Sequence, residues 1–280
     1  MPAFETIDHA AAQRLISDGI TVIDVRTPHE YSELGHIPGA LLIPVDLIAT
    51  APATLTDDVR QVLVYCEHGV RSRSASQVLA AAGVPEVLNL AGGLERWTGP
   101  REFGPGAIAG PSSWLLQNAG LLPRGGRVLD VACGRGRHAL LLAGAGCDVT
   151  AIDRNVEAIT RLRMIAERLG FPIRTEALDL ETDPPPHLGS HLYDAVLGFN
   201  YLHRPLFPAL KEAVKSGGRL FYETFTRPQA QRGHPRNPAF LLDEGELQQL
   251  VAPFRILRAR EGEFEGRFIA SVVAERLGAD

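Results

Sequence analysis

Two glycines and an aspartate lie close together near the middle of the chain. The stretch reads Val-Leu-Asp130-Val-Ala132-Cys133-Gly134-Arg-Gly136 and is followed by helix-forming alanine and leucine. Glycine has no Cβ, so a ligand can approach the backbone closely there, and the free N–H groups at the start of the next helix point toward that ligand. A strand, a glycine turn and a helix in this order predict a nucleotide-type site at the carboxyl end of a parallel sheet.

The acid in this stretch helps to decide which ligand is bound. The spacing Gly134-x-Gly136-x-x-Ala139 fits the loose dinucleotide fingerprint, which is weak evidence by itself. A carboxylate at Asp130 would repel a pyrophosphate, but it would attract an ammonium or sulfonium group. The pattern resembles the first motif of class I S-adenosylmethionine-dependent methyltransferases, with Ala132 in place of the first glycine.

Two further acids end the next two expected strands. Asp153 ends the strand expected over 148–153, at about the 20-residue spacing of a ribose-binding acid, and a carboxylate can accept two hydrogen bonds from a vicinal diol. Asp179 lies at the end of the strand expected over 173–180. In the family, an acid there meets the adenine amino group and the next residue, here Leu180, packs on the ring. The resemblance implies a cofactor-binding set of Asp130, Ala132, Cys133, Gly134, Gly136, Asp153, Arg154, Asp179, Leu180 and Asn200.

The methyl acceptor is expected beyond the fourth strand of this domain, at 193–199, because that strand end adjoins the methyl group in class I methyltransferases. Methyl transfer is an in-line displacement, so the protein mainly positions the nucleophile. His203 could serve as a general base near neutral pH; the alternative is a loop histidine hydrogen-bonded for packing. The candidate substrate contacts are Tyr201, Arg204, Tyr222, Glu223, Arg227 and Arg232.

The loop 227–236 contains three arginines and a histidine. It is either a solvated loop or a set of guanidinium forks that receives an anionic substrate. The amino-acid sequences of the glycine loop and of the fourth strand also resemble those of the tellurite-resistance group of small-molecule methyltransferases. We therefore expect a small soft or anionic acceptor, such as a thiol, a persulfide or a chalcogen oxyanion.

A second candidate for chemistry is Cys66, between a strand expected over 61–65 and a helix expected over 72–82. Its sulfur could lie among the N–H groups at the start of that helix, and this field, with Arg71, would stabilise a thiolate. A buried structural cysteine is the alternative. The charged loop around Cys66 argues for an exposed thiol instead.

The first hundred residues resemble a single rhodanese domain. The segments that carry the resemblance are Asp24-Val-Arg26, Glu30, Gly35-His-Ile-Pro-Gly39-Ala40, Cys66-Glu-His-Gly-Val-Arg71-Ser72 and Gly92-Gly93-x-x-x-Trp97. The resemblance implies that Cys66 takes sulfane sulfur from a donor and passes it to a thiophile, with Arg71 in the catalytic loop. Phosphatases of related fold need five residues between the cysteine and the arginine to surround a phosphate, whereas four residues separate Cys66 from Arg71. Sulfur transfer is therefore favoured over phosphate hydrolysis. A non-catalytic binding or redox-sensing module remains the alternative.

Alternating strands and helices on both sides of a Gly- and Pro-rich stretch predict two α/β domains. We expect a small rhodanese-like α/β domain over 1–98 and a linker over 99–112. A Rossmann-like class I methyltransferase domain is expected over 113–280. The predicted cofactor is S-adenosylmethionine, and the predicted partners are a small-molecule methyl acceptor and a sulfane-sulfur donor.

The amino-acid composition argues against several other classes of protein. The 280 residues carry a net charge of −5 and are 45% hydrophobic, and no stretch approaches the ~20 apolar residues that span a bilayer. Residues 1–100 hold six arginines, no lysine and twelve acids, so neither half has the basic footprint of a nucleic-acid binder. Three scattered cysteines form no disulfide framework or metal motif. A cytoplasmic protein without a membrane or nucleic-acid partner is expected; the oligomeric state is left open.

Overall fold

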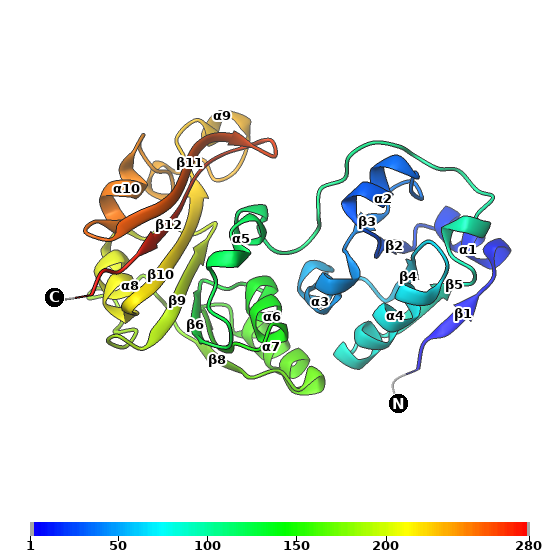
Figure 1. Cartoon of the computed structure of the whole chain (residues 1–280), viewed down its shortest axis with the longest axis horizontal. Coiled ribbons are helices and arrows are strands. Elements are labelled where there is room, and N and C mark those ends of the chain that lie inside the picture. The colour runs from blue at the N-terminus through cyan, green and yellow to red at the C-terminus, as the bar shows by residue number, and fades with distance from the viewer. Residues whose placement is uncertain (1–2, 279–280) are drawn as a thin grey trace. The chain divides into compact units, whose positions relative to one another are not determined.

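The computed structural model describes residues 3–278 and divides into two compact units, with the boundary between Pro111 and Ser112. Each unit contains its own sheet (Figure 1). The predicted fold class, two successive α/β domains, is confirmed. None of the helices within the described range is long and apolar enough to cross a membrane.

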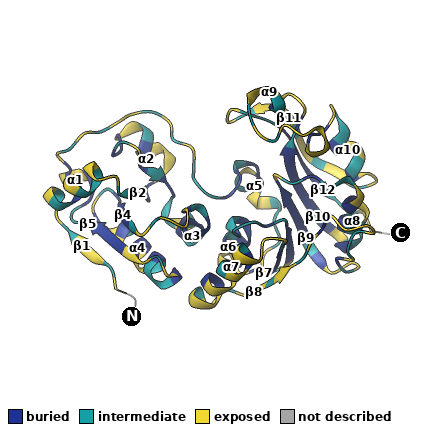
Figure 2. Ribbon diagram, turned by 180° about the vertical axis from the view of Figure 1, so that it is seen from behind, coloured by how far each residue is buried: buried dark blue, intermediate teal, exposed yellow. Residues whose placement is uncertain are grey.

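The first unit is built on a five-stranded sheet in the order β1-β5-β4-β2-β3, with every neighbouring pair parallel. Its central strands are buried, as in parallel sheets covered by helices on both faces (Figure 2). The strands are β1 (Glu5–Ile7), β2 (Thr21–Asp24), β3 (Leu41–Leu42), β4 (Gln61–Tyr65) and β5 (Glu86–Leu90). The helices are α1 (His9–Ser17), α2 (Pro28–Glu33), α3 (Ala51–Thr54) and α4 (Val70–Ala82), with 3-10 helices at Val45–Thr50 and Leu94–Arg96.

The Gly- and Pro-rich segment that follows lies along the first unit. Glu102 pairs with His36, and Ile108 pairs with Leu42 as isolated β-bridges. The N–H of Ala109 donates to the carbonyl of Leu42 at 2.9 Å. The stretch that we predicted as a linker therefore begins as an extended strap on the first unit.

The second unit is built on a seven-stranded sheet in the order β11-β12-β10-β9-β6-β7-β8, in which only the pairings of β12 are antiparallel. The strands are β6 (Arg127–Val131), β7 (Asp148–Asp153), β8 (Ile173–Ala177), β9 (Tyr193–Phe199), β10 (Val214–Phe225), β11 (Arg255–Phe264) and β12 (Arg267–Glu275). The helices are α5 (Ser113–Gln117), α6 (Arg137–Gly144), α7 (Val156–Leu169), α8 (Phe207–Ala213), α9 (Gln229–Arg232) and α10 (Glu246–Val251), with 3-10 turns at Ala119–Leu121, Arg204–Leu206 and Pro238–Phe240.

The order of the second sheet reverses at β6, which pairs with β7 on one side and with β9 on the other. Open parallel sheets bind ligands outside the carboxyl ends of the strands at such a switch point. Asp130 is next to the last residue of β6, and Asp153 is the last residue of β7. The topology thus brings the predicted cofactor residues to one edge of the sheet.

Some elements differ from the sequence expectations, among them β8, which was expected over 173–180 and ends at Ala177. The sequence of residues 241–251 predicts a helix, but α10 begins only at Glu246, because Leu242 pairs with Thr226 and Gly245 has a positive φ of 70°. The sequence of residues 40–44 predicts a strand, but only β3 forms, since Pro44 has no N–H for a ladder and the 3-10 helix begins directly after it.

Candidate active sites

The turn after β6 has a left-handed backbone at three alternate positions. The φ angles are 50° at Ala132, 55° at Gly134 and 83° at Gly136. A Cβ at Gly136 would lie 2.4 Å from the Leu162 side chain, so only glycine fits that position. At Gly134 a Cβ would meet no atom within 4 Å, which leaves open space above the turn. This is the room that a ligand needs for a close approach to the backbone.

Asp130 is 1% exposed, and its Oδ2 has no hydrogen-bond partner among the described residues. Burial raises the pKa of Asp130 to about 7, against the opposing effect of the positive charge of Arg137. A buried carboxylate oxygen without a partner is costly. A cationic ligand group would donate a hydrogen bond to this oxygen and would balance the negative charge of the carboxylate.

Asp153 connects the end of β7 to the glycine turn. Its Oδ2 accepts the N–H of Gly134 at 2.7 Å, and its Oδ1 accepts the N–H of Asn155 at 2.8 Å. Cys133, between the two, is buried, and burial raises the pKa of its thiol. Cys133 therefore acts here as a small packing residue rather than as a nucleophile.

A cavity of about 220 Å³ opens over the ends of β6, β7, β8 and β9. It collects the predicted Asp153, Asp179 and Leu180 around one space, whereas Asp130 and the glycines lie in the adjoining turn. The lining residues are Ala132, Asp153, Arg154, Leu178, Asp179, Leu180, Glu181, Asn200 and Tyr201.

A second cavity, of about 640 Å³, shares four residues with the first and extends toward the end of β10 and the loop after α9. Its lining residues are Arg154, Glu181, Asn200, Tyr201, Leu202, Thr224, Phe225, His234, Pro235, Arg236, Asn237 and Phe240. The hydroxyls of Tyr201 and Thr224 are buried and have no partner within residues 3–278. Unsatisfied hydroxyls at a cavity indicate groups that await a ligand or water.

Several lining residues of the second cavity were not predicted as site residues. His234 and Arg236 lie in the arginine-rich loop that we noted in the sequence, and Thr224 follows a predicted candidate on β10. Phe240 carries no sequence signal. It lies in the 3-10 turn Pro238–Phe240, for which nothing was predicted from the sequence.

Two predicted substrate residues on β10 are placed in the core instead. Tyr222 is fully buried and donates its hydroxyl to the carbonyl of Tyr201 at 2.8 Å. Glu223 is 1% exposed and accepts hydrogen bonds from Ser112, Ser271 and Arg260. Neither side chain lines a described cavity, because both are buried within the carboxyl-terminal half of the strand.

Three predicted substrate arginines are engaged by acids. Arg204 forms a bidentate pair with Glu246 at 2.5 and 2.8 Å and also binds the carbonyls of Ala239 and Leu241. The other pairs join Arg227 to Asp243 and Arg232 to Glu263. Of the arginines in the loop 227–236, Arg236 is the one that lines the second cavity. The alternative of an anion-receiving set of arginines stays a prediction.

His203 stays a prediction as a general base. Its Nε2 is buried without a hydrogen-bond partner in the described part of the chain, yet His203 is not among the lining residues of the two cavities. Asn200, by contrast, lines both cavities and turns the chain at a positive φ of 57°, which asparagine tolerates better than most residues.

In the first unit, Cys66 follows β4 directly, as predicted, but the residue is buried (1% exposed), contrary to the expectation of an exposed thiol. The loop folds back over the sulfur. Sγ accepts the N–H groups of Gly69 at 3.2 Å and Ser72 at 3.3 Å. Backbone N–H groups at a helix start stabilise an anionic sulfur. Gly93 lets the next turn close on the loop, since a Cβ there would lie 2.3 Å from the Cys66 carbonyl.

Arg71 does not reach toward the sulfur as a free cation, because its guanidinium forms a bidentate pair with Glu30 at 2.8 and 2.5 Å. Glu30 is held in turn by the backbone N–H and hydroxyl of Thr27, in a capping box that begins α2. The hydrogen bond from Arg71 is the largest cause that lowers the pKa of Glu30, to about 2.

Known proteins resemble both units. The profile of the rhodanese-like domain family matches residues 8–100, and that of a methyltransferase domain family matches residues 128–218. A sulfurtransferase from Allochromatium vinosum is 37% identical over 33% of this chain and 86% of its own length. The thiosulfate sulfurtransferase GlpE from Ectopseudomonas mendocina is 37% identical over 38% of this chain and 98% of its own.

The second unit resembles the crystal structure of TehB from Haemophilus influenzae, with a TM-score of 0.50 and 23% identity. The similarity covers 61% of this chain and 63% of that one, so less than two thirds of TehB is matched. At this identity the likeness shows the fold.

The chain is thus an α/β protein that joins a sulfurtransferase-like domain to a methyltransferase domain. Its first part belongs to the rhodanese-like family, and the second is a class I methyltransferase domain, a class that uses S-adenosylmethionine as methyl donor. No group of metal-ligating side chains is found within the residues described.

Proposed function

We propose that this chain methylates a small acceptor with S-adenosylmethionine, and that the two cavities of the second unit hold the cofactor and the acceptor. The observation that carries the proposal is the orphaned, buried Oδ2 of Asp130 beside an open glycine turn. A carboxylate in this state fits the ammonium group of the cofactor's methionine part. S-adenosylmethionine supplies a methyl group already activated by its sulfonium.

The remaining cofactor contacts follow from the strand ends. Asp153 would accept the ribose hydroxyls, and Asp179 with Leu180 would hold the adenine at the far side of the first cavity. Asn200 and Tyr201 line both cavities, so the two ligands would meet beside them. These residues bind and orient the reactants, which is the main contribution that a protein makes to an in-line displacement.

The second cavity supports an acceptor that is soft or anionic, such as a thiol, a persulfide or a chalcogen oxyanion. Arg236 and His234 can neutralise an anion there, while the hydroxyls of Tyr201 and Thr224 can hydrogen-bond it. Phe225 supplies an apolar wall. The similarity to TehB concerns the fold and does not identify the acceptor. Tellurite is therefore one of several acceptors to be tested.

Cys66 of the first unit is proposed to carry sulfane sulfur. Support comes from the two N–H groups that converge on Sγ, which would also hold the terminal sulfur of a persulfide anion. The competing function is a binding or redox-sensing module. Such a module would keep the two N–H groups that bind Sγ but would not transfer sulfur.

The methyltransferase proposal is tested by calorimetric titration of the full chain with S-adenosylmethionine and its demethylated product, followed by a turnover screen over thiols, selenite, tellurite and small metabolites. Arg236→Gln should raise the KM for an anionic acceptor without weakening cofactor binding. Tight binding of NADH with no binding of S-adenosylmethionine would contradict the assignment.

The sulfur-carrier proposal is tested by intact mass after treatment with sulfane-sulfur donors. Wild type should gain one sulfur atom. Cys66→Ser should not, whereas Cys133→Ser and Cys147→Ser should gain it normally because both of those thiols are buried with raised pKa values. A wild-type mass that no donor changes would favour the binding-module alternative.

A further inference from the structure

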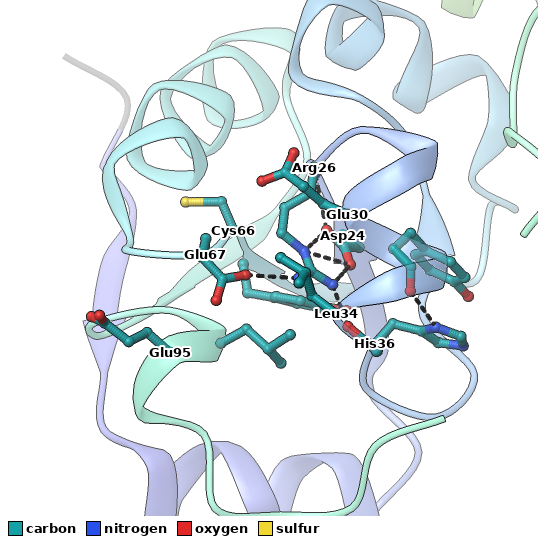
Figure 3. A network of polar contacts seen from close by, with 12 residues as sticks. Asp24, Arg26, Glu30, Leu34, His36, Cys66, Glu67 and Glu95 are labelled. Carbon is teal, nitrogen blue, oxygen red and sulfur yellow. Dashed lines mark hydrogen bonds and ion pairs between the residues drawn. The ribbon is translucent and has the colours of Figure 1, made fainter. Parts of the chain in front are cut away.

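A network of charged side chains lies beside the Cys66 loop (Figure 3). Its members are the carboxylates of Asp24, Glu30 and Glu67 and the guanidinium groups of Arg26 and Arg71. With every member ionised, three negative charges face two positive ones. The network therefore carries a net negative charge before the Cys66 thiolate is added, and residues 1–100 as a whole are acidic.

Arg71, in the first turn of α4, is the only arginine or lysine among residues 66–72. Both of its terminal nitrogens bind Glu30, and Glu30 is oriented by two further hydrogen bonds from Thr27. A bidentate guanidinium–carboxylate pair of this kind has strong, directional hydrogen bonds. An incoming anion would have to displace Glu30 before it could use the Arg71 fork.

Arg26 is no more accessible to a donor. It is fully buried, and its nitrogens donate to Asp24, to the carbonyl of Gly35 and to Glu67. Glu67 follows Cys66 directly and has a side chain that is 19% exposed. The residue beside the nucleophile therefore adds negative charge where a donor would arrive.

We propose that Glu30, assisted by Glu67, selects against dianionic sulfur donors, so that Cys66 accepts sulfur from an organic persulfide in preference to thiosulfate. The proposal rests on the sulfur-carrier role of Cys66 given above. The relatives of this chain include proteins whose name specifies thiosulfate, so thiosulfate is the donor against which the preference is measured.

The two donors react through the same bond changes. The Cys66 thiolate attacks the outer sulfur, the donor's S–S bond breaks, and a new S–S bond forms on Sγ. The electron pair leaves with sulfite in one case and with an organic thiolate, which then takes a proton, in the other. Thiosulfate brings two negative charges to the loop, whereas a persulfide with an uncharged organic group brings at most one. Coulomb repulsion from the network is therefore larger for thiosulfate.

The test compares second-order rate constants for sulfur uptake by the full chain from thiosulfate and from the persulfide of 2-mercaptoethanol. Glu30→Gln frees the Arg71 fork and keeps a residue that capping boxes accept. It should raise the thiosulfate-to-persulfide rate ratio on the order of tenfold, as expected for one charge a few ångströms away in a partly solvated site. Added salt should speed the wild-type thiosulfate reaction and affect the variant less.

Glu86→Gln is the matched control, because Glu86 is exposed at the amino end of β5, at the sheet edge opposite the loop. An equal rise in that variant would assign the effect to net charge and overturn the proposal. Glu67→Gln gives a second route to the same rise if Glu30→Gln lowers stability. A ratio that neither variant changes also overturns it, as does a thiosulfate rate that depends on the exposed Arg73 or Arg96. Failure of both donors on wild type would instead remove the carrier role itself.

Discussion

At the scale of single residues, Asp130 links ligand binding to pH. Its pKa is raised to about 7 in the folded protein, whereas an unfolded chain ionises aspartate near pH 4. Between these values the folded state binds more protons than the unfolded state. Stability of the ligand-free protein should therefore fall as pH rises from about 4 to about 7.

The variant Asp130→Asn removes this ionisation. At pH 8 it should be more stable than wild type, by at most about 4 kcal/mol from the size of the pKa shift, and it should lose S-adenosylmethionine affinity. Denaturant unfolding at pH 5 and pH 8 measures the effect. An equal stability difference at the two pH values would contradict the buried, ionising carboxylate.

Asp153 acts both on the glycine turn and on the proposed ribose site. Asp153→Ala should weaken S-adenosylmethionine binding by roughly 1.5–3 kcal/mol, the range for hydrogen bonds to a charged group. Asp148→Ala, at the exposed opposite end of β7, is the matched control. Calorimetry would tell against the assignment if the two variants bound equally well.

The residues that the sequence predicted best are those whose roles depend on local pattern. The glycine turn, Asp153 and the cysteine loop follow directly from short motifs next to buried strands. The charge partners could not be predicted, because Arg71 meets Glu30 and Arg204 meets Glu246 across long stretches of chain. These long-range pairs engage two arginines that were predicted to act in a site, and their roles there stay predictions.

At the scale of helices and strands, local sequence again predicts well, whereas features that depend on long-range contacts are missed. β4, β7 and β9 begin and end where the apolar runs predicted, since buried parallel strands read as continuous apolar segments. Residues 241–245 were predicted to begin a helix but are not helical, because tertiary contacts set the conformation of the segment 238–245, among them the bonds from Arg204 to the carbonyls of Ala239 and Leu241. A wall of the second cavity depends on this segment.

Arg204→Ala should loosen that wall. We expect a loss of about 1 kcal/mol in stability, after allowance for the partial exposure of the ion pair, and a higher KM for the acceptor. Cofactor affinity should be unchanged, because the first cavity does not include these residues. Arg227→Ala, which breaks an exposed pair, is the control and should have no measurable effect on stability.

At the scale of the whole molecule, the two units keep separate apolar cores. One core of the second unit gathers around Leu129, Val196 and Leu220. The cores of the first unit gather on the two faces of its own sheet. Each unit thus has the interior that an independently folding domain requires, and a variant in one site should leave binding at the other intact.

The strap over residues 101–109 determines where the molecule can be divided. The family similarity ends at residue 100, but backbone pairing with the first unit continues to Ala109, and Ser112 already donates its N–H to His138 of the second unit. A fragment that stops at residue 98 would leave the backbone of His36 and Leu42 without these partners and uncover the ring of Tyr31, which packs against Gly106.

A rhodanese fragment that ends at residue 111 should therefore melt at a higher temperature than one that ends at 98, and should resist proteases better. Paired melting curves of the two fragments decide the point. If they coincide, the strap contributes nothing to stability. If they differ as expected, the stable folded unit of this rhodanese domain is longer than its sequence signature. A fusion of the domain to another protein must then include the strap.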